Sequence, residues 1–114
     1  MTGVTPEQAV RAMEEAGADA VGANCGNGVE AFPAICARMR AASGLPLWIK
    51  ANAGMPEIVN GEAVYGTLPA HFASYLPALL AAGASFVGGC CGTSPAFIAA
   101  LRKGWPHAIP ADRL

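Results

Sequence analysis

The sequence lacks long apolar segments and lacks an excess of charge of either sign. None of its apolar runs approaches the roughly 18 residues of a membrane-spanning helix. Seven basic and eight acidic residues give a net charge of -1, without a run of like charges. Nucleic acids and anionic membranes attract strongly basic surfaces, so the sequence predicts neither as a partner.

The first ten residues, MTGVTPEQAV, contain neither the basic nor the apolar segment of a secretory signal. The chain nevertheless has four cysteines. Without a secretory signal, clustered thiols are more often metal ligands or catalytic groups than disulfides, because the cytoplasm keeps thiols reduced. We therefore expect a cytoplasmic protein.

Apolar residues make up 54% of the sequence and charged residues only 13%. This composition predicts elements that are buried on both sides. The 114 residues suffice for one small domain, and no low-complexity segment or internal boundary divides them.

Helix and strand patterns alternate along the chain. Thr5, Pro6 and Gln8 combine the N-cap, first-turn proline and capping box of a helix start. Short apolar segments with little polar alternation predict buried strands near residues 19–24, 46–51 and 85–89. Helical spacing of apolar residues before, between and after these segments predicts the order αβαβαβα.

Details of the later elements are also predicted. A loop is expected from about Asn52 to Gly66, followed by a helix in which Pro77 should produce a kink. A last helix should begin near Pro95, with Thr93 or Ser94 as its cap.

Helices between consecutive strands predict right-handed crossovers and a parallel sheet in an α/β fold. Three parallel strands alone would leave two open edges. Parallel sheets also normally have more strands and are covered on both faces. We therefore expect part of a larger body, or a chain that completes its sheet with another chain. A homo-oligomer formed through the open edges is one such arrangement.

Three of the four cysteines follow predicted strands, at the carboxyl ends where α/β folds carry their functional groups. Cys25 follows the first strand, and the adjacent Cys90 and Cys91 follow the third. Three converging thiolates would form a zinc site with one open position, provided that the flanking glycines let the chain bend. Cys36 lies on the apolar stripe of a helix and is expected in the core.

Other interpretations of these cysteines remain open. The three could be buried and unliganded, or Cys90 and Cys91 could act as a redox dithiol. A disulfide between these neighbours is disfavoured by the strain of its eight-membered ring.

The remaining polar and aromatic candidates are weaker. Asn52 ends the second strand on the cysteine side, where its amide oxygen could be a weak zinc ligand. The GNG stretch from Gly26 to Gly28 lacks the rest of a phosphate-binding motif, and a glycine turn is the better interpretation. Surface or packing positions are expected for His71, His107, Glu14, Glu15, Trp48 and Trp105.

Three motifs occur in a specific order: GANCGNG, ANAGMP and GGCCGTSP. Together they resemble the GxNCxxGP, PNAGxP and GGCCGTTP motifs of the homocysteine S-methyltransferase family. The family pattern has proline at Val29 and Ala51 and threonine at Ser94, but none of these departures removes a cysteine.

The resemblance implies a fold and a set of site residues. The family folds as a (β/α)8 TIM barrel of about 250 residues, so residues 1–114 would be the C-terminal part of such a domain, about the last three βα units. By position, Cys25, Cys90 and Cys91 would hold the catalytic zinc. Asn52 matches the asparagine of PNAG, and both Asn24 and Asn52 would lie where the substrate binds.

The resemblance also implies a reaction. The family transfers a methyl group to the thiol of homocysteine, giving methionine, with zinc activating that thiol. The stretch MPEIVNGEAVY is most similar to the corrinoid-dependent methionine synthase branch. Methylcobalamin and methyltetrahydrofolate would then bind on other domains, whereas S-methylmethionine or betaine serves other branches. The alternative is an inactive barrel fragment, or a zinc-binding or assembly module.

Overall fold

A computed structural model describes residues 3–106 of the chain. Its elements follow one another as α1 (Pro6–Glu15), β1 (Val21–Cys25), a 3-10 helix η1 (Val29–Ala31), α2 (Phe32–Ala42), β2 (Leu47–Ala51), β3 (Pro56–Val59), β4 (Glu62–Tyr65), α3 (Pro69–Ala73), α4 (Leu76–Ala81), β5 (Ala84–Gly89) and α5 (Pro95–Gly104). The three predicted strands are present as β1, β2 and β5, each displaced from its expected ends by no more than two residues.

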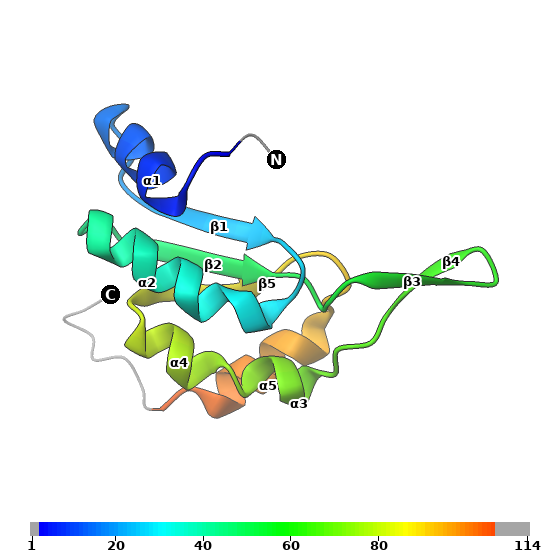
Figure 1. Ribbon diagram of the computed structural model, residues 1–114. Helices are drawn as coiled ribbons and strands as arrows, with labels where there is room; N and C mark the ends of the chain where they lie inside the picture. Colours follow the sequence, from blue (N-terminus) through cyan, green and yellow to red (C-terminus); the bar gives the residue numbers. More distant parts are fainter. Residues whose placement is uncertain (1–2, 107–114) are drawn as a thin grey trace.

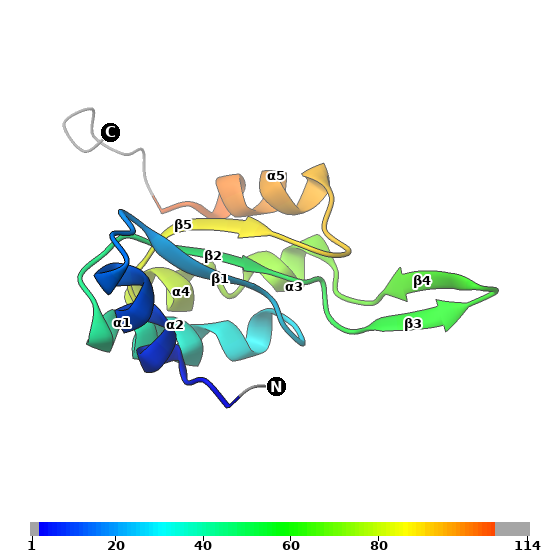
Figure 2. The ribbon, with the colours of Figure 1, turned by 90° about the horizontal axis from the view of Figure 1, so that it is seen from above.

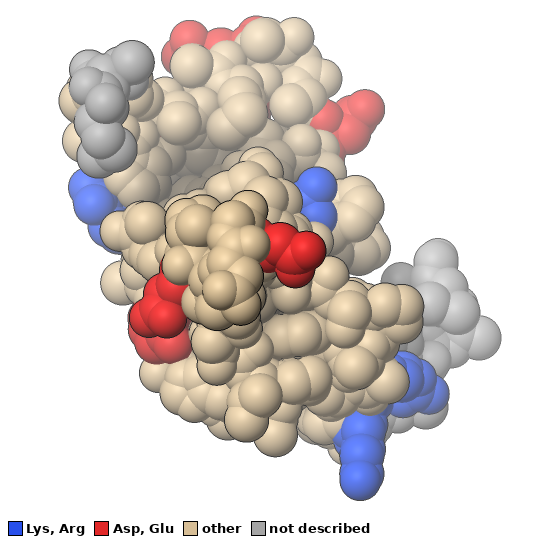
Figure 3. Space-filling model, turned by 90° about the vertical axis from the view of Figure 1, so that its right-hand side faces the viewer, with Lys and Arg blue, Asp and Glu red and all other residues tan. Residues whose placement is uncertain are grey.

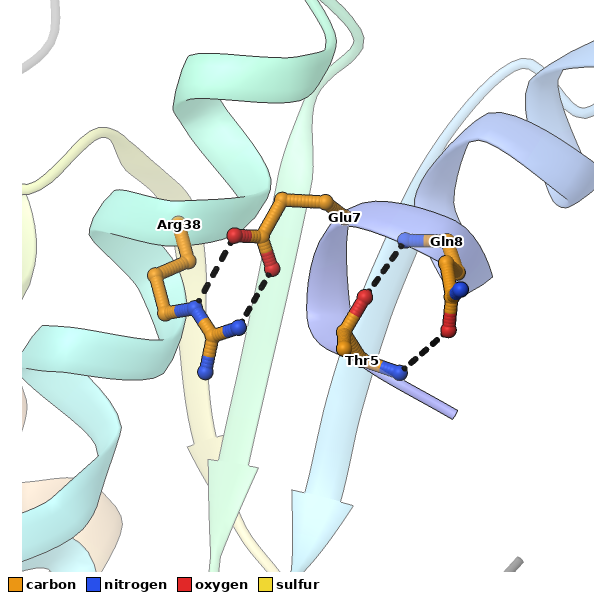
Figure 4. Close-up of polar contacts among 4 residues, drawn as sticks. All are labelled: Thr5, Glu7, Gln8 and Arg38. Atoms are coloured by element: carbon orange, nitrogen blue, oxygen red, sulfur yellow. Dashed lines mark hydrogen bonds and ion pairs between the residues drawn. The ribbon is translucent and has the colours of Figure 1, made fainter. Parts of the chain in front are cut away.

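Helix α1 begins with the predicted capping box (Figure 4). The Thr5 hydroxyl accepts a hydrogen bond from the Gln8 amide at 3.1 Å, and the Gln8 side chain accepts one from the Thr5 amide at 3.0 Å. In the same first turn Glu7 forms an ion pair with Arg38 of α2, with 2.8 Å between Nη2 and Oε1. The two helices are therefore joined on their exposed side.

Strands β1, β2 and β5 form a parallel sheet in the order β1-β2-β5 (Figure 1). Helix α2 packs against β2, while α4 and α5 pack against β5. Phe72 of α3 and Phe97 of α5 meet edge to face with their ring centroids 5.3 Å apart. This arrangement confirms the predicted mixed α/β fold with a parallel sheet.

The two faces of the sheet differ in burial. In β2, Leu47, Ile49 and Ala51 are buried in the core, whereas the intervening Trp48 is 49% exposed. Phe86 of β5 is 51% exposed and packs against Trp48 at 5.7 Å between centroids. The composition predicted burial on both sides, but within residues 3–106 this face has no covering element.

A β-hairpin occupies the segment that was expected to be a loop. Strands β3 and β4 pair antiparallel around Asn60 and Gly61, which have φ angles of 52° and 80°. Asn-Gly with both φ angles positive is the preferred two-residue hairpin turn, so the local sequence contained this signal. The hairpin projects from the end of the parallel sheet (Figure 2).

Two details around prolines differ from expectation. Pro77 lies in the first turn of α4 rather than inside a kinked helix, because α3 ends at Ala73 and a new helix begins at Leu76. Proline removes a backbone donor, which a first helical turn does not need. Helix α5 begins at Pro95 as predicted, but the side chain of its N-cap Ser94 forms no capping hydrogen bond.

The helices described between residues 3 and 106 are all too short or too polar to cross a lipid bilayer.

Candidate metal centre

Three cysteine thiols converge at the carboxyl ends of β1 and β5. Cys25 is the last residue of β1, and Cys90 and Cys91 directly follow β5. Their Sγ atoms all lie within 4.8 Å of one another, and those of Cys25 and Cys90 are 3.0 Å apart. The parallel register places the ends of β1 and β5 on either side of the end of β2. Residues 65 positions apart in the chain thereby become neighbours.

The backbone bends at both cysteine-bearing segments. Cys25 has a φ of 64°, which is unusual for a residue with a side chain, and Gly26 follows with 72°. After β5, the Thr93 amide and hydroxyl both donate to the Cys90 carbonyl, at 3.1 Å and 2.6 Å. This turn and the left-handed bend after β1 bring the sulfurs together, as the flanking glycines had suggested.

Asn52 connects the two cysteine-bearing segments from the end of β2. Its Oδ1 accepts a hydrogen bond from the Cys91 amide at 2.9 Å, and its Nδ2 donates to the Gly26 carbonyl at 3.0 Å. The neighbouring Ala53 amide donates to the Cys91 carbonyl at 2.9 Å. The sequence pointed to Asn52 as a weak ligand or substrate contact but gave no indication of this bridge.

Asn24 donates directly to the sulfur atoms. Its Nδ2 lies 3.1 Å from the Cys25 Sγ and 3.8 Å from the Cys90 Sγ. Hydrogen bonds from Cys25 and Asn24 lower the pKa of the Cys90 thiol to about 7. The pKa of the Cys25 thiol is raised, chiefly by its hydrogen bond with the Cys90 thiol.

This donor set fits zinc. Thiolates are soft ligands, and a tetrahedral ion with Zn–S bonds of about 2.3 Å places its sulfurs about 3.8 Å apart. Cys25 and Cys90 are half-buried and Cys91 is exposed, so a small exogenous ligand can reach the cluster. With three protein donors, one position of a tetrahedral zinc would stay open.

The other candidates lie outside the cluster, as expected. Cys36 is fully buried and its thiol lies 3.7 Å from the Ala82 carbonyl, while burial raises its pKa. His71 is exposed and pairs with Glu30 at 3.0 Å. The GNG stretch forms a turn in which Gly26 and Gly28 have positive φ. Trp105 packs against the core, and His107 lies outside the described residues.

The surface at this end of the molecule is mostly uncharged. Figure 3 views it along the projecting hairpin and shows separate acidic and basic side chains instead of a patch of either sign. Sequence reasoning missed that this hairpin contributes Tyr65 to the cysteine region: the ring lies over Gly92, the residue after Cys91. The Asn60-Gly61 dipeptide would have predicted the hairpin, but no local signal predicts the Tyr65 contact.

Comparison with known proteins gives consistent matches. The sequence profile described as homocysteine S-methyltransferase matches residues 1–104. The methionine synthase of Mycobacterium tuberculosis is 36% identical over 79% of this chain, which corresponds to 8% of that protein. The homocysteine S-methyltransferase of Escherichia coli is 38% identical over 73% of this chain and 27% of its own length.

Solved structures give the same result. The metallated form of the homocysteine methyltransferase MmuM from Escherichia coli superimposes with a TM-score of 0.65 at 32% sequence identity. The match covers 85% of this chain and 28% of MmuM. The chain thus spans less than a third of the curated relatives and solved structures that it matches. The chain belongs to the homocysteine S-methyltransferase family.

Proposed function

We propose that residues 1–114 form the C-terminal part of a homocysteine S-methyltransferase domain and hold zinc through Cys25, Cys90 and Cys91. The observation that carries this proposal is the convergence of three Sγ atoms within 4.8 Å of one another at the carboxyl ends of parallel strands. The carboxyl end of the strands is where βα barrels place their active sites.

The uncovered face of the sheet supports a partial (β/α)8 barrel. Trp48 and Phe86 are about half exposed there, although large aromatic side chains normally contribute to a core. Met13, Trp48 and Lys50 line a hollow of about 290 Å³ beside them. We infer that this face is the inner wall of a barrel whose remaining βα units lie outside these residues. Strands β1, β2 and β5 would be the last three strands of that barrel.

The residues around the sulfurs orient them for metal binding. Asn24 holds its amide against the Cys25 and Cys90 sulfurs, and Asn52 fixes the peptide of Cys91. Because the Asn52 oxygen has a second lone pair, it is also the candidate for a weak fourth ligand in the absence of substrate. Both asparagines would then lie beside the bound thiol of the substrate.

The reaction proposed for the complete protein is methyl transfer to the thiol of homocysteine, which gives methionine. Bound zinc would stabilise the thiolate form of a thiol whose ordinary pKa is near 8.5, and so make it nucleophilic at neutral pH. The similarity to a methionine synthase favours methylcobalamin as donor, charged from methyltetrahydrofolate. These cofactors would bind on other domains.

The zinc site is tested by measuring metal content. The chain is purified without chelator, and zinc per chain is determined for the wild type and for Cys25→Ala, Cys90→Ala and Cys91→Ala. We expect about one zinc per wild-type chain and loss of uptake in each variant. Cys36→Ala is the matched control, because Cys36 is a core thiol, and it should retain zinc. A wild type that takes up no added zinc would refute the site.

A second measurement separates a substrate-activating site from a zinc module without activity. L-homocysteine is added to the zinc-loaded chain in weakly buffered indicator solution, with homoserine as the control that lacks the thiol. Proton release with homocysteine alone supports the methyltransferase site. Zinc binding with no response to homocysteine would support the zinc-binding or assembly module instead.

A further inference from the structure

The base of the β3–β4 hairpin touches the cysteine-bearing loop through one aromatic ring. Tyr65 is the last residue of β4, and its ring covers the Cα of Gly92. A Cβ added at Gly92 would overlap the Cγ, Cδ1 and Cδ2 atoms of this ring. Gly92 also has a φ of 80°, so both the backbone angle and the ring require glycine at this position.

A second contact joins the segment after β4 to the segment after β2. The Thr67 amide donates to the Ala53 carbonyl at 3.2 Å, while the Ala53 amide donates to the Cys91 carbonyl at 2.9 Å. A Cβ at Gly54 would lie 2.9 Å from the Thr67 hydroxyl, which shows how closely the two segments approach. The base of the hairpin therefore lies against the loop that carries Cys90 and Cys91.

The rest of the hairpin makes no comparable contact. Every residue of β3 is exposed, Ile58 to 73%, and Val64 beside Tyr65 is 46% exposed. Tyr65 alone among the four residues of β4 is half-buried. The one residue of these two strands that is withdrawn from solvent thus lies against the residue that follows Cys91.

We propose that Tyr65 is a positioning residue for the metal centre. Its ring holds the loop from Cys90 to Gly92 in the conformation in which both thiols face Cys25. Without the ring, Gly92 gains access to the wide range of backbone angles open to glycine, and the Cys91 thiol, the most exposed of the three, loses its fixed direction. This inference rests on the proposed zinc site.

The test compares Tyr65→Ala and Tyr65→Phe with Val64→Ala, which removes an exposed side chain from the adjacent position. Zinc affinity of the whole chain is measured by competition with a chromogenic chelator. We expect Tyr65→Ala to bind zinc about 10-fold more weakly, as is typical for loss of a residue that orients a ligand. Tyr65→Phe retains the ring and should bind within about twofold of the wild type, as should Val64→Ala.

If Tyr65 only stabilised the fold, the folded protein would bind zinc equally well with and without its ring. If Tyr65→Ala matches the wild type in zinc affinity, or weakens it no more than Val64→Ala, the inference is wrong. Urea unfolding of the metal-free variants provides the folded fraction used in the comparison. Should Tyr65→Ala not fold, Tyr65→Leu replaces it, because leucine keeps apolar bulk but lacks the flat ring that covers Gly92.

Substitution of Gly92, the residue that the Tyr65 ring covers, gives an independent test of this contact. Gly92→Ala should weaken zinc binding, and the loss in the Tyr65→Ala/Gly92→Ala double variant should be smaller than the two single losses combined, because the new Cβ then has no ring to collide with. Losses in the double variant that simply add would contradict the contact.

Failure of the zinc site itself can be recognised separately. If the wild type binds no zinc, the proposed function fails, and amide hydrogen exchange of Cys91 and Thr93 in the metal-free chain still decides the role of Tyr65. Faster exchange in Tyr65→Ala, but not in Val64→Ala, supports positioning of the loop. Equal exchange in both overturns it.

Discussion

Cysteine occurs in two regions of this molecule with opposite properties. In the core between the sheet and α2, Cys36 is fully buried among apolar side chains, and burial raises its pKa. At the carboxyl end of the sheet, Cys90 is half-buried among polar groups, and its pKa is lowered to about 7. The comparison shows that location within the fold, and not residue type, decides whether burial raises the pKa of a thiol or hydrogen bonds lower it.

The two regions also differ in how they are held together. The core consists of alternate strand residues such as Leu47 and Ile49, both fully buried, that pack against helices. The cysteine end is held by hydrogen bonds from Asn24 and Asn52 and by residues with positive φ. Changes in the core should therefore alter folding stability, and changes at the cysteine end should alter metal binding.

The largest effect is expected from Ile49→Ala in the core. Removal of a fully buried branched side chain leaves a cavity, and the free energy of unfolding should fall by about 2–5 kcal/mol. Urea denaturation measures the change, and Ile49→Val should lose only about 1 kcal/mol. The remaining folded fraction should bind zinc with unchanged affinity. A large loss of zinc affinity in the folded fraction would contradict the separation between a core that determines stability and a cysteine end that determines metal binding.

The second-largest effect is expected in the alkylation rates of Cys90 and Cys36, of which Cys90 should react faster. In the metal-free protein at pH 7, about half of Cys90 is thiolate, whereas the raised pKa of Cys36 leaves almost none, so alkylation should differ by at least about 50-fold. The Cys90 rate should fall as pH drops below 7, because its thiolate is then protonated. Mass spectrometry after iodoacetamide treatment follows both sites. Equal labelling of the two residues in the folded protein would contradict the assigned environments.

A smaller effect is expected from Asn52→Ala. Loss of the bridge between the Gly26 carbonyl and the Cys91 amide should weaken zinc binding by about 10-fold, because oriented ligands lose their supports. Chelator competition measures the affinity. Asn27→Ala is the control, because Asn27 is an exposed residue beside Gly26 in the loop after β1, and it should bind as the wild type does. The bridge has no role in the metal site if the two variants behave alike.

The smallest effect is expected from Cys36→Ala. Replacing the buried thiol by a methyl group should lower the free energy of unfolding by about 1 kcal/mol, a typical value for a modest core change. Zinc per chain should be unchanged, since Cys36 lies outside the cluster of three sulfurs. Zinc content is measured together with the unfolding curve of this variant. Loss of zinc from the folded protein would contradict the assignment of Cys36 to the core.

Much of the fold could be predicted because its signals are local. The capping box at Thr5 is encoded in four consecutive residues, and the apolar segments that become β1, β2 and β5 lack the alternation of exposed strands. The order of these elements then predicts a parallel sheet. Its carboxyl end must carry Cys25, Cys90 and Cys91, because parallel strands point in the same direction.

The supports of the candidate site could not be predicted in the same way. The Asn52 bridge joins residues 26 and 39 positions away, and the Tyr65 ring reaches Gly92 across a hairpin that was expected to be a loop. Such contacts depend on the distance between segments after folding. No pattern of neighbouring residues specifies that distance.

The sequence by itself determined which residues of this protein are chemically able to form the site, and which end of the sheet they share. The tertiary structure alone decided that Cys25 and Cys90 approach to 3.0 Å, that Asn24 directs its amide at both sulfurs, and that one face of the sheet is left uncovered within the described residues. The physical reason is that strand direction follows from chain order, whereas side-chain distances follow from twist, register and packing.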